Sequence, residues 1–173
     1  MKRQSIAAAL AVLILSCPGH AKEAADLVLY HGKVLTVDEA FSIKSALVVK
    51  DGKVLVVGDD TLAQKYEAPT RIDLQGRTLM PGFMDNHLHP MTRGKRAIDA
   101  ERAKSITDIQ SMYTYNPTFL TWDEHRKGTL EPGKFADFII LDSDPLTIPP
   151  EKLLTLKVLQ TFIGGKKVYS ANN

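Results

Sequence analysis

The chain contains one cysteine, Cys17, among its 173 residues. A single cysteine cannot form a disulfide within the chain, so packing must supply the stability of the fold. The chain also has little excess of charge of either sign. The formal net charge is +2, and both extra positive charges come from Lys2 and Arg3. Residues 22–173 carry 20 basic and 20 acidic side chains, which gives no electrostatic reason to expect nucleic acid or an anionic membrane surface as a partner.

Long apolar segments are scarce as well. Ile6–Leu15 is an apolar run of ten residues, and ten helical residues extend only about 15 Å, half the thickness of a bilayer core. We therefore expect no membrane span. The positive residues before this run, and the small residues Gly19 and Ala21 shortly before Lys22, predict an export signal over residues 1–21 and a periplasmic or extracellular protein.

Cys17 leaves the processing of this signal open. Ile14–Cys17 loosely resembles a bacterial lipobox, in which the cysteine is lipidated and becomes the new N-terminus. The alternative is cleavage before Lys22, which would remove Cys17 together with the signal. The first route would give a lipid-anchored protein and the second a protein without a lipid.

Glycine-containing turns separate short apolar runs along most of the remaining chain. An apolar content of 44% and a charged content of 24% are ordinary for one globular domain. Runs of β-forming residues on both sides of a two-residue turn predict β-hairpins. Four such turns are present, namely His31-Gly32, Asp51-Gly52, Gln75-Gly76 and Gly164-Gly165. Because hairpins lie at both ends of the chain, a sheet that pairs the two terminal regions leaves the fewest open edges.

Helices are expected in only a few places. Short helical segments are predicted over about Asp60–Tyr66 and near Glu151–Leu156. Ser105 and Asp108 have the spacing of a capping box, which marks the start of a further helix. The expected fold class is therefore mainly β with some α.

The stretch Pro81–Pro90 contains the candidate site. In a strand, alternate side chains share one face, so Asp85, His87 and His89 would project together. Two imidazoles held in this way can bind one zinc ion, whose bonds to nitrogen are about 2.0–2.1 Å long. The pattern leaves two interpretations open: half of a metal site, or two solvated histidines at the end of a strand.

Three further polar residues bear on this site. Asp85 either supports a ligand by a hydrogen bond or coordinates the metal itself, and the first role is the more common one. His31 lies in a turn and is expected to face solvent, and His125 lies in a charged loop and is expected to be exposed.

Two longer motifs carry a resemblance to a known family. Residues Arg77–His89, which include Pro-Gly-Phe-Met-Asp-Asn-His-Leu-His, resemble the signature of the amidohydrolase superfamily, where such a run forms the first barrel strand. Residues Gly128–Asp142 resemble its C-terminal signature, where the chain re-enters a small β-sandwich. Asn116–Glu124 and Thr161–Tyr169 are similar to the branch that contains N-substituted formamide deformylase-like enzymes.

The resemblance implies a β-sandwich built from both termini and a central (β/α)8 barrel that holds one or two divalent metals, often zinc. It implies that His87 and His89 are metal ligands, and that later strands supply the remaining ligands and a proton-shuttling aspartate. A bound metal of this kind lowers the pKa of water toward neutrality and polarises a carbonyl. The implied reaction is hydrolysis of a non-peptide carbon–nitrogen bond in a small amide-type substrate.

The chain departs from this pattern in length. A (β/α)8 barrel takes about 250 residues, whereas 38 residues, 90–127, separate the two signatures. The implied organisation is a signal peptide at 1–21, a composite β-sandwich from 22–80 with 128–173, and a barrel remnant at 81–127. Most of the barrel would be deleted, with a join near Ser111–Tyr113, so that only its first strand and its first and last helices remain.

Two functions follow from this departure. The first is a metal-dependent hydrolase with an incomplete active site and weak or absent metal binding, because the proton-shuttling aspartate has no counterpart. The second is a non-catalytic β-sandwich remnant or a misassembled gene fragment. In both cases Leu79, Met80, Phe83 and Met84 would lack their barrel partners, which favours association of copies. The substrate is not encoded in the surviving loops.

Overall fold

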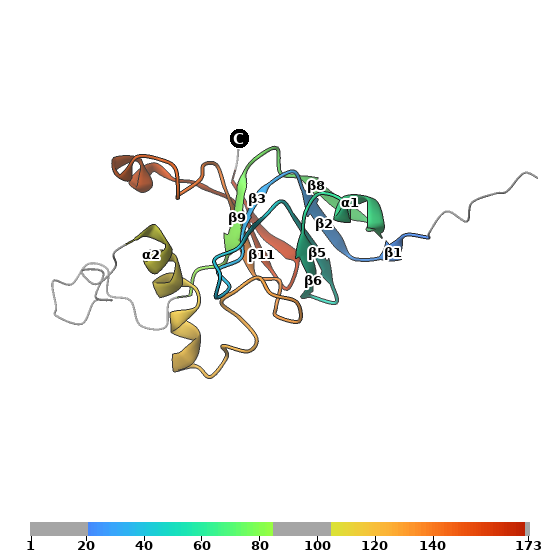
Figure 1. Ribbon diagram of the computed structural model, residues 1–173, viewed down its shortest axis with the longest axis horizontal. Coiled ribbons are helices and arrows are strands. Elements are labelled where there is room, and N and C mark those ends of the chain that lie inside the picture. The colour runs from blue at the N-terminus through green and yellow to red at the C-terminus, as the bar shows by residue number, and fades with distance from the viewer. Residues whose placement is uncertain (1–20, 85–104, 172–173) are drawn as a thin grey trace, which may run out of the picture.

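The computed structural model describes residues 21–84 and 105–171, which form two β-sheets, a short strand pair and a few helical segments (Figure 1). The prediction of a mainly β fold with some α is confirmed. Before residue 85 the strands are β1 (Glu23–Ala24), β2 (Leu27–Tyr30), β3 (Lys33–Leu35), β4 (Ile43–Lys44), β5 (Ala46–Lys50), β6 (Lys53–Gly58), β7 (Tyr66–Glu67), β8 (Thr70–Asp73) and β9 (Thr78–Pro81). After residue 104 they are β10 (Phe138–Leu141), β11 (Val158–Ile163) and β12 (Lys166–Ser170).

Four helical segments accompany these strands in the described residues. They are α1 (Leu62–Lys65), α2 (Ile106–Tyr113) and the 3-10 helices η2 (Asn116–Leu120) and η3 (Pro150–Thr155). Figure 1 shows α1 on one side of the sheets and α2 on the other. Among the described residues, none of the helices is long and apolar enough to cross a membrane.

The larger sheet joins strands from both parts of the chain. Its order is β12-β11-β10-β9-β3-β4, and the antiparallel pair of β9 with β10 connects the N-terminal strands to the C-terminal ones. The second sheet has the order β6-β5-β2-β8 and contains N-terminal strands alone. We call these the six-stranded and the four-stranded sheet.

The main core lies between these two sheets. The four-stranded sheet contributes Leu29 and Leu47, and the six-stranded sheet contributes Leu79, Phe138 and Phe162. These side chains are at most 3% exposed. Because neighbouring residues of a strand point to opposite faces, each sheet also has an apolar face on its outer side. On the four-stranded sheet α1 covers that face, with Leu62 packed into a cluster around Val28 and Val48.

Two of the four predicted hairpins are confirmed. β5 and β6 pair antiparallel around Asp51-Gly52, and β11 and β12 pair antiparallel around Gly164-Gly165. All four turn residues have positive φ, between 51° and 75°. This conformation suits glycine and, among other residues, aspartate, as the two-residue hairpin turn requires.

The other two predicted hairpins are wrong. β2 pairs with β5 and β8 in the four-stranded sheet, whereas β3 pairs with β4 and β9 in the six-stranded sheet. The His31-Gly32 turn therefore carries the chain from one sheet to the other, and Gln75-Gly76 does the same between β8 and β9. The two crossings run side by side, because Gly76 N donates to His31 O at 2.7 Å. β2 and β9 bury nearly all their side chains by this arrangement, which a free-standing hairpin could not achieve, whereas most side chains of the edge strand β8 are exposed.

The helix predictions hold with small shifts in the ends. The predicted helix start is confirmed, because Ser105 Oγ accepts a hydrogen bond from Asp108 N at 3.1 Å and caps α2. α1 lies inside the predicted range 60–66, and η3 replaces the expected helix near 151–156 by a 3-10 segment.

Leu79 and Met80 correct one further expectation. They do not lack partners: β9 lies between β3 and β10, and the two side chains are 0% and 1% exposed. Phe83, beyond the end of β9, is 57% exposed. The uncovered apolar surface is therefore smaller than the sequence predicts and starts only after the strand.

Candidate functional site

The predicted metal ligands His87 and His89, and the supporting residue Asp85, lie outside the described residues. The structure describes the approach to them, Gly82–Met84. Gly82 N donates to Asp137 O at 3.0 Å, and Met84 N donates to Tyr113 O at 2.8 Å. These two bonds attach the chain before Asp85 to the start of β10 on one side and to the end of α2 on the other.

The ring of Phe83 provides a third attachment at the same place. It packs edge to face on the Tyr113 ring, with the ring centroids 6.1 Å apart. α2 itself is held at its C-terminal end by Thr114, whose hydroxyl donates to Gln110 O at 2.8 Å. The approach to the predicted site is thus positioned by hydrogen bonds and an aromatic contact rather than by deep burial.

A cleft of about 800 Å³ opens beside this approach. Gly82 and Phe83 form one wall, and Ile139, Thr161 and Tyr169 of three neighbouring strands form the other. The lining is mainly apolar, so the cleft can receive an apolar group, and its titratable residues are Lys127, Asp137, Lys157 and Tyr169.

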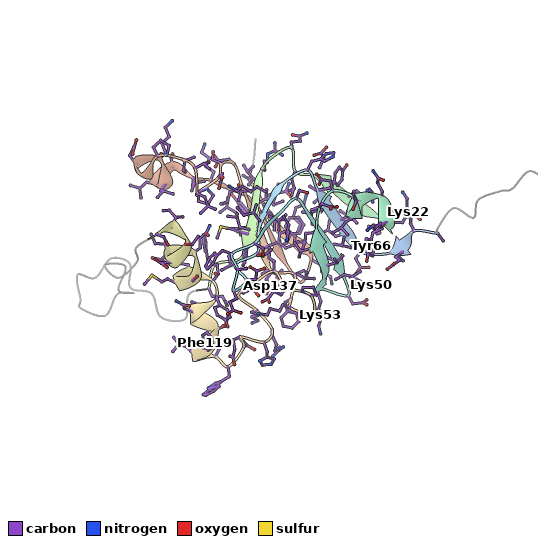
Figure 2. The ribbon with its side chains drawn as sticks, viewed as in Figure 1. Lys22, Lys50, Lys53, Tyr66, Phe119 and Asp137 are labelled. Carbon is purple, nitrogen blue, oxygen red and sulfur yellow. The ribbon has the colours of Figure 1, made fainter. Side chains whose placement is uncertain are left out.

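Asp137 is the one carboxylate among the residues that line this cleft. Its Oδ1 accepts a hydrogen bond from Gly164 N at 2.7 Å, which fixes the β11–β12 turn. In Figure 2 Asp137 lies within the body of the molecule, whereas Phe119, which is 51% exposed, lies at its periphery. The position and the hydrogen bond indicate that Asp137 has a structural role, as expected for a residue at the return to the sheet.

The described residues do not complete a metal site. Within ranges 21–84 and 105–171, no group of three His, Cys, Asp or Glu side chains lies close enough together to hold a metal ion. His125 is exposed, as predicted. His31 lies in the first crossing turn, with its side chain 57% exposed and its Nδ1 3.2 Å from Asp73 Oδ2. The described part of the chain therefore contains no metal site of its own.

The carboxylate of Asp73 has a perturbed pKa. The backbone N–H of Gln75, 2.9 Å from Asp73 Oδ1, and then the side chain of His31 hold this pKa below its usual value. His31 N in turn donates to Asp60 Oδ1 at 2.7 Å, which stabilises the left-handed conformation of the turn. These contacts fasten the crossing turns together and suggest no reaction.

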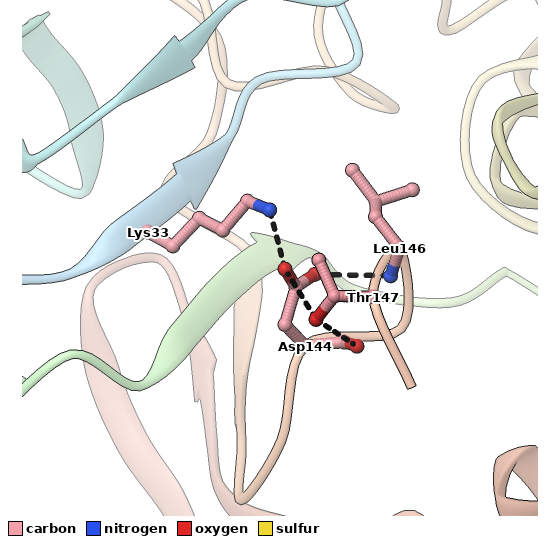
Figure 3. A network of polar contacts seen from close by, with 4 residues as sticks. All are labelled: Lys33, Asp144, Leu146 and Thr147. Atoms are coloured by element: carbon pink, nitrogen blue, oxygen red, sulfur yellow. Dashed lines mark hydrogen bonds and ion pairs between the residues drawn. The ribbon is translucent and has the colours of Figure 1, made fainter. Parts of the chain in front are cut away.

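A largely buried ion pair, which sequence patterns do not reveal, joins β3 to the loop after β10. The Lys33 ammonium of β3 contacts Asp144 Oδ2, and Figure 3 shows the same carboxylate with the backbone N–H of Leu146 and the hydroxyl of Thr147. Burial alone would raise the pKa of Asp144, but the hydrogen bonds from Lys33 and Leu146 outweigh it and hold the pKa below its usual value. Since 111 residues separate Lys33 from Asp144, no local motif could have indicated the pair.

Comparison with known proteins identifies the lineage of the second half of the chain. Residues 90–169 match the model of the amidohydrolase family. The sequence matches support the amidohydrolase superfamily. The family match begins at the residue that follows His87-Leu88-His89, so the candidate ligands immediately precede it.

Several curated proteins are similar to parts of this amidohydrolase-like chain. The exoenzymes regulatory protein AepA of Pectobacterium carotovorum is 36% identical over 39% of the chain and 15% of its own length. N-substituted formamide deformylase of Arthrobacter pascens is 36% identical over 37% of the chain and 12% of its own length. Adenine deaminase of Bacillus subtilis is 24% identical over 69% of the chain and 18% of its own length. The chain thus spans less than a fifth of each of these relatives.

Three solved structures each overlap less than half of this chain. An adenosine deaminase from Xanthomonas campestris with bound zinc is 20% identical, with a TM-score of 0.34 over 36% of this chain and 15% of that one. L-hydantoinase from Arthrobacter aurescens is 30% identical, with a TM-score of 0.31 over 44% of this chain and 18% of that one. A protein from Bacillus thuringiensis is 35% identical, with a TM-score of 0.33 over 41% of this chain and 96% of that one. At such TM-scores these likenesses carry no further argument.

Proposed function

We propose that this chain derives from a metal-dependent hydrolase of non-peptide carbon–nitrogen bonds and encodes only part of that enzyme's metal site. The observation that carries the proposal is the amidohydrolase match over residues 90–169, directly after His87-Leu88-His89. Two of the similar proteins, a deformylase and an adenine deaminase, have names that denote cleavage of a carbon–nitrogen bond. The formamide deformylase-like branch remains part of this proposal.

His87 and His89 are proposed as two ligands of a divalent metal, zinc, with Asp85 as a hydrogen-bonding support for one of them. A catalytic zinc site takes three protein ligands and one open position. Within residues 21–84 and 105–171, no group of three His, Cys, Asp or Glu side chains could hold a metal ion by itself. The described residues therefore do not form a complete catalytic site, and we derive no reaction step through a metal in this chain.

The proposed organisation has a composite β-sandwich, 22–80 with 128–173, and a barrel remnant at 81–127. The pairing of β9 with β10 supports the first part, because it joins strands from both sides of the remnant in one sheet. The proposed deletion near Ser111–Tyr113 falls inside α2, which continues without a break from Ile106 to Tyr113. A join at this place would have fused two helices into one.

A non-catalytic β-sandwich remnant, or a misassembled gene fragment, is the second candidate. The core between the two sheets favours it, because every side chain of that core belongs to residues 27–79 or 130–162. The sheets can therefore bury their apolar faces without the 47 residues of 81–127. Such a protein would keep its fold without any activity.

Zinc stoichiometry separates these functions. We would incubate the purified chain with zinc, desalt it, and measure metal per chain by mass spectrometry. Well under one zinc per chain is expected, because two histidines hold zinc weakly without a third ligand. Stoichiometric zinc that is lost in His87→Ala and His89→Ala, but retained in the exposed control His125→Ala, would instead show a complete site, with ligands shared between copies.

The coding DNA gives an independent test of the deletion. Resequencing across codons 108–115 should return the same continuous reading frame if the short chain is real. Several hundred additional codons at this point would show that the deletion is an assembly artefact, and the complete barrel chemistry would then be restored.

We also propose that residues 1–21 direct export. The positive residues, apolar run and small residues before Lys22 support this proposal. Mass spectrometry of the mature protein distinguishes its two forms, since cleavage leaves Lys22 as the first residue and lipidation leaves a modified Cys17.

A further inference from the structure

The strand β12, Lys166–Ser170, forms one edge of the six-stranded sheet, and all five of its residues are exposed. The other strands at the edges of the two sheets offer less. β4 has two residues and β8 has four, and β6 is partly covered on its outer side, since Val54 N donates to Lys134 O at 2.9 Å. β12 is therefore the longest edge strand that no other described segment covers, and such an edge can add a further strand.

The direction of the backbone groups of β12 follows from one hydrogen bond. Ala171 N donates to Leu159 O at 2.8 Å, so the N–H of Ala171 points toward β11. Backbone groups alternate in direction along a strand of an antiparallel pair, so those of Ser170 and Val168 point away from the sheet. Val168 is skipped in the register between β11 and β12, as expected for the extra residue of a bulge. The outer edge thus presents two donor and acceptor positions, Val168 and Ser170, with Tyr169 between them.

We propose that β12 pairs with β12 of a second copy of this chain, antiparallel and about a two-fold axis at Tyr169. Val168 of each copy then exchanges hydrogen bonds with Ser170 of the other, and the two Tyr169 side chains lie directly opposite each other. Such a pair is of the non-hydrogen-bonded kind, in which side chains approach closely, and aromatic pairs across strands stabilise a sheet. Tyr169 is 50% exposed in the single chain, so the pairing removes part of its ring from water. This interface does not depend on the proposed hydrolase function.

The charges of β12 select this arrangement. Lys166 and Lys167 are the first two residues of the strand. A parallel pair in register, or an antiparallel pair centred on Lys167, would place lysines of the two copies directly opposite each other, which is destabilising. With the axis at Tyr169, Lys167 opposes Ala171 of the other copy, and no lysine opposes a lysine. The pairing consumes the edge of both copies, and β4 at the far edge of the sheet has two residues, so the assembly closes as a dimer.

The test is sedimentation velocity of the full chain over a range of concentrations, with Ser170→Pro and Ser170→Ala as a matched pair of variants. Proline removes an N–H that points away from β11, which an edge strand tolerates. The wild-type chain should show an equilibrium between monomer and dimer. Ser170→Pro should weaken the dimer about ten-fold or more, because each dimer loses two hydrogen-bond donors. Ser170→Ala keeps both donors and should leave the dimer unchanged.

Hydrogen exchange measures the same edge directly. The Ser170 amide should exchange rapidly in the dilute chain and slowly in the dimer, whereas the Ala171 amide, which is bonded to Leu159 O, should be protected in both. A chain that stays monomeric at every concentration would overturn the proposal, and so would a Ser170 amide that is already protected in the dilute chain, because the edge would then be covered.

The variants exclude the other arrangements. A dimer that Ser170→Pro leaves intact, or one that Phe83→Ser weakens instead, would overturn the proposal, since the exposed ring beyond β9 would then hold the copies together. Circular dichroism should show the same β content in wild type and Ser170→Pro. Loss of the fold in this variant would also overturn the proposal, because the N–H of Ser170 would then belong to the ladder with β11.

Discussion

The two ends of the sheet pair are closed by different kinds of turn. At one end His31-Gly32 and Gln75-Gly76 carry the chain from the four-stranded to the six-stranded sheet, and at the other Asp51-Gly52 and Gly164-Gly165 return it within its own sheet. The strand registers place these pairs at opposite ends, since Leu29 opposes Leu47 at the start of β5 and Lys50 opposes Lys53 at its end. We call them the crossing turns and the hairpin turns.

Local conformation does not distinguish the two kinds. The first residue of every turn has a positive φ between 51° and 53°. What differs is the partner of the turn backbone. A crossing turn bonds the other crossing turn, whereas the hairpin turns meet around Ala136, which bonds Gly52 O at 3.0 Å and Gly165 N at 2.8 Å. Tertiary contacts therefore decide whether an x-Gly turn folds back or crosses.

The largest effect is expected at the hairpin end. In Gly165→Ala the new Cβ would lie 2.7 Å from Val49 Cγ1, at a φ of 71°. Left-handed strain and overpacking together should lower the free energy of unfolding by about 3 kcal/mol. Gly164→Ala, at φ 53° with open space around it, should lower it by about 1 kcal/mol through strain alone. Urea unfolding would measure both, and equal losses would show that Val49 yields to the added methyl group.

At the crossing end the expected effect of the same change is somewhat smaller. Gly32 has no positive φ, but an alanine Cβ would lie 2.2 Å from Leu74 Cδ1 and 2.9 Å from Leu74 Cβ. Overpacking should lower the free energy of unfolding by about 2 kcal/mol. The same change in a Leu74→Ala background should lower it less, because Leu74 Cδ1, the nearest clashing atom, is gone and Cβ alone remains. If the two losses of stability were instead additive, the cost would not lie in the contact with Leu74 Cδ1.

The Lys33–Asp144 ion pair ranks next, because it ties β3, just after the first crossing, to the loop after β10. Lys33→Met should lower the free energy of unfolding at neutral pH by about 1.5 kcal/mol, since a largely buried carboxylate loses its charged donor. The depressed pKa of Asp144 means that its contribution is complete above the unfolded-state pKa, about 4, and is lost as pH falls through the lower folded-state pKa.

The pH dependence of that variant is the sharper measurement. Lys33→Met removes one of the groups that depress the pKa of Asp144, so the folded-state pKa should lie closer to the unfolded-state pKa and the acid-induced loss of stability should be smaller than in the wild-type chain. Urea midpoints between neutral pH and pH 3 would measure this difference. Asp144→Asn is the control, because it has no carboxylate and should flatten this part of the profile. If stability changed with pH in the same way in all three proteins, Asp144 would not be the cause of the acid-induced loss of stability.

The turn comparison also shows what the sequence could predict. The β content, the hairpin turns and the capped start of α2 follow from local patterns that the structure confirms. The crossing turns were predicted as hairpins because the same x-Gly pattern serves both, and the choice depends on strands far away in the chain. The burial of Gln110 had no local signal either, since a polar residue in a helix usually faces solvent.

The candidate site divides in the same way. A His-x-His run after an apolar strand is a local pattern, so His87 and His89 could be named as ligands from the sequence, and that assignment stays a prediction. A third ligand has to come from another element, as Asp144 comes to Lys33 across 111 residues. Periodicity cannot supply such a partner. Only the fold can bring it to the site.

The smallest effect is expected for the exposed pair of His31 and Asp73 at the crossing turns. The backbone N–H of Gln75 is the main cause of the low pKa of Asp73, and the His31 side chain comes second. His31→Ala should therefore lower stability less than Asp73→Ala, which loses both contacts. Because the folded-state pKa of Asp73 is depressed, its contribution is present at neutral pH and disappears as pH falls through that pKa. The difference between wild type and His31→Ala should shrink over the same range and also with added salt, as for other solvent-exposed pairs. If His31→Ala instead destabilised the chain as much as Gly32→Ala, the side chain of His31, and not the packing of Gly32 against Leu74, would determine that the chain crosses between the sheets at this turn.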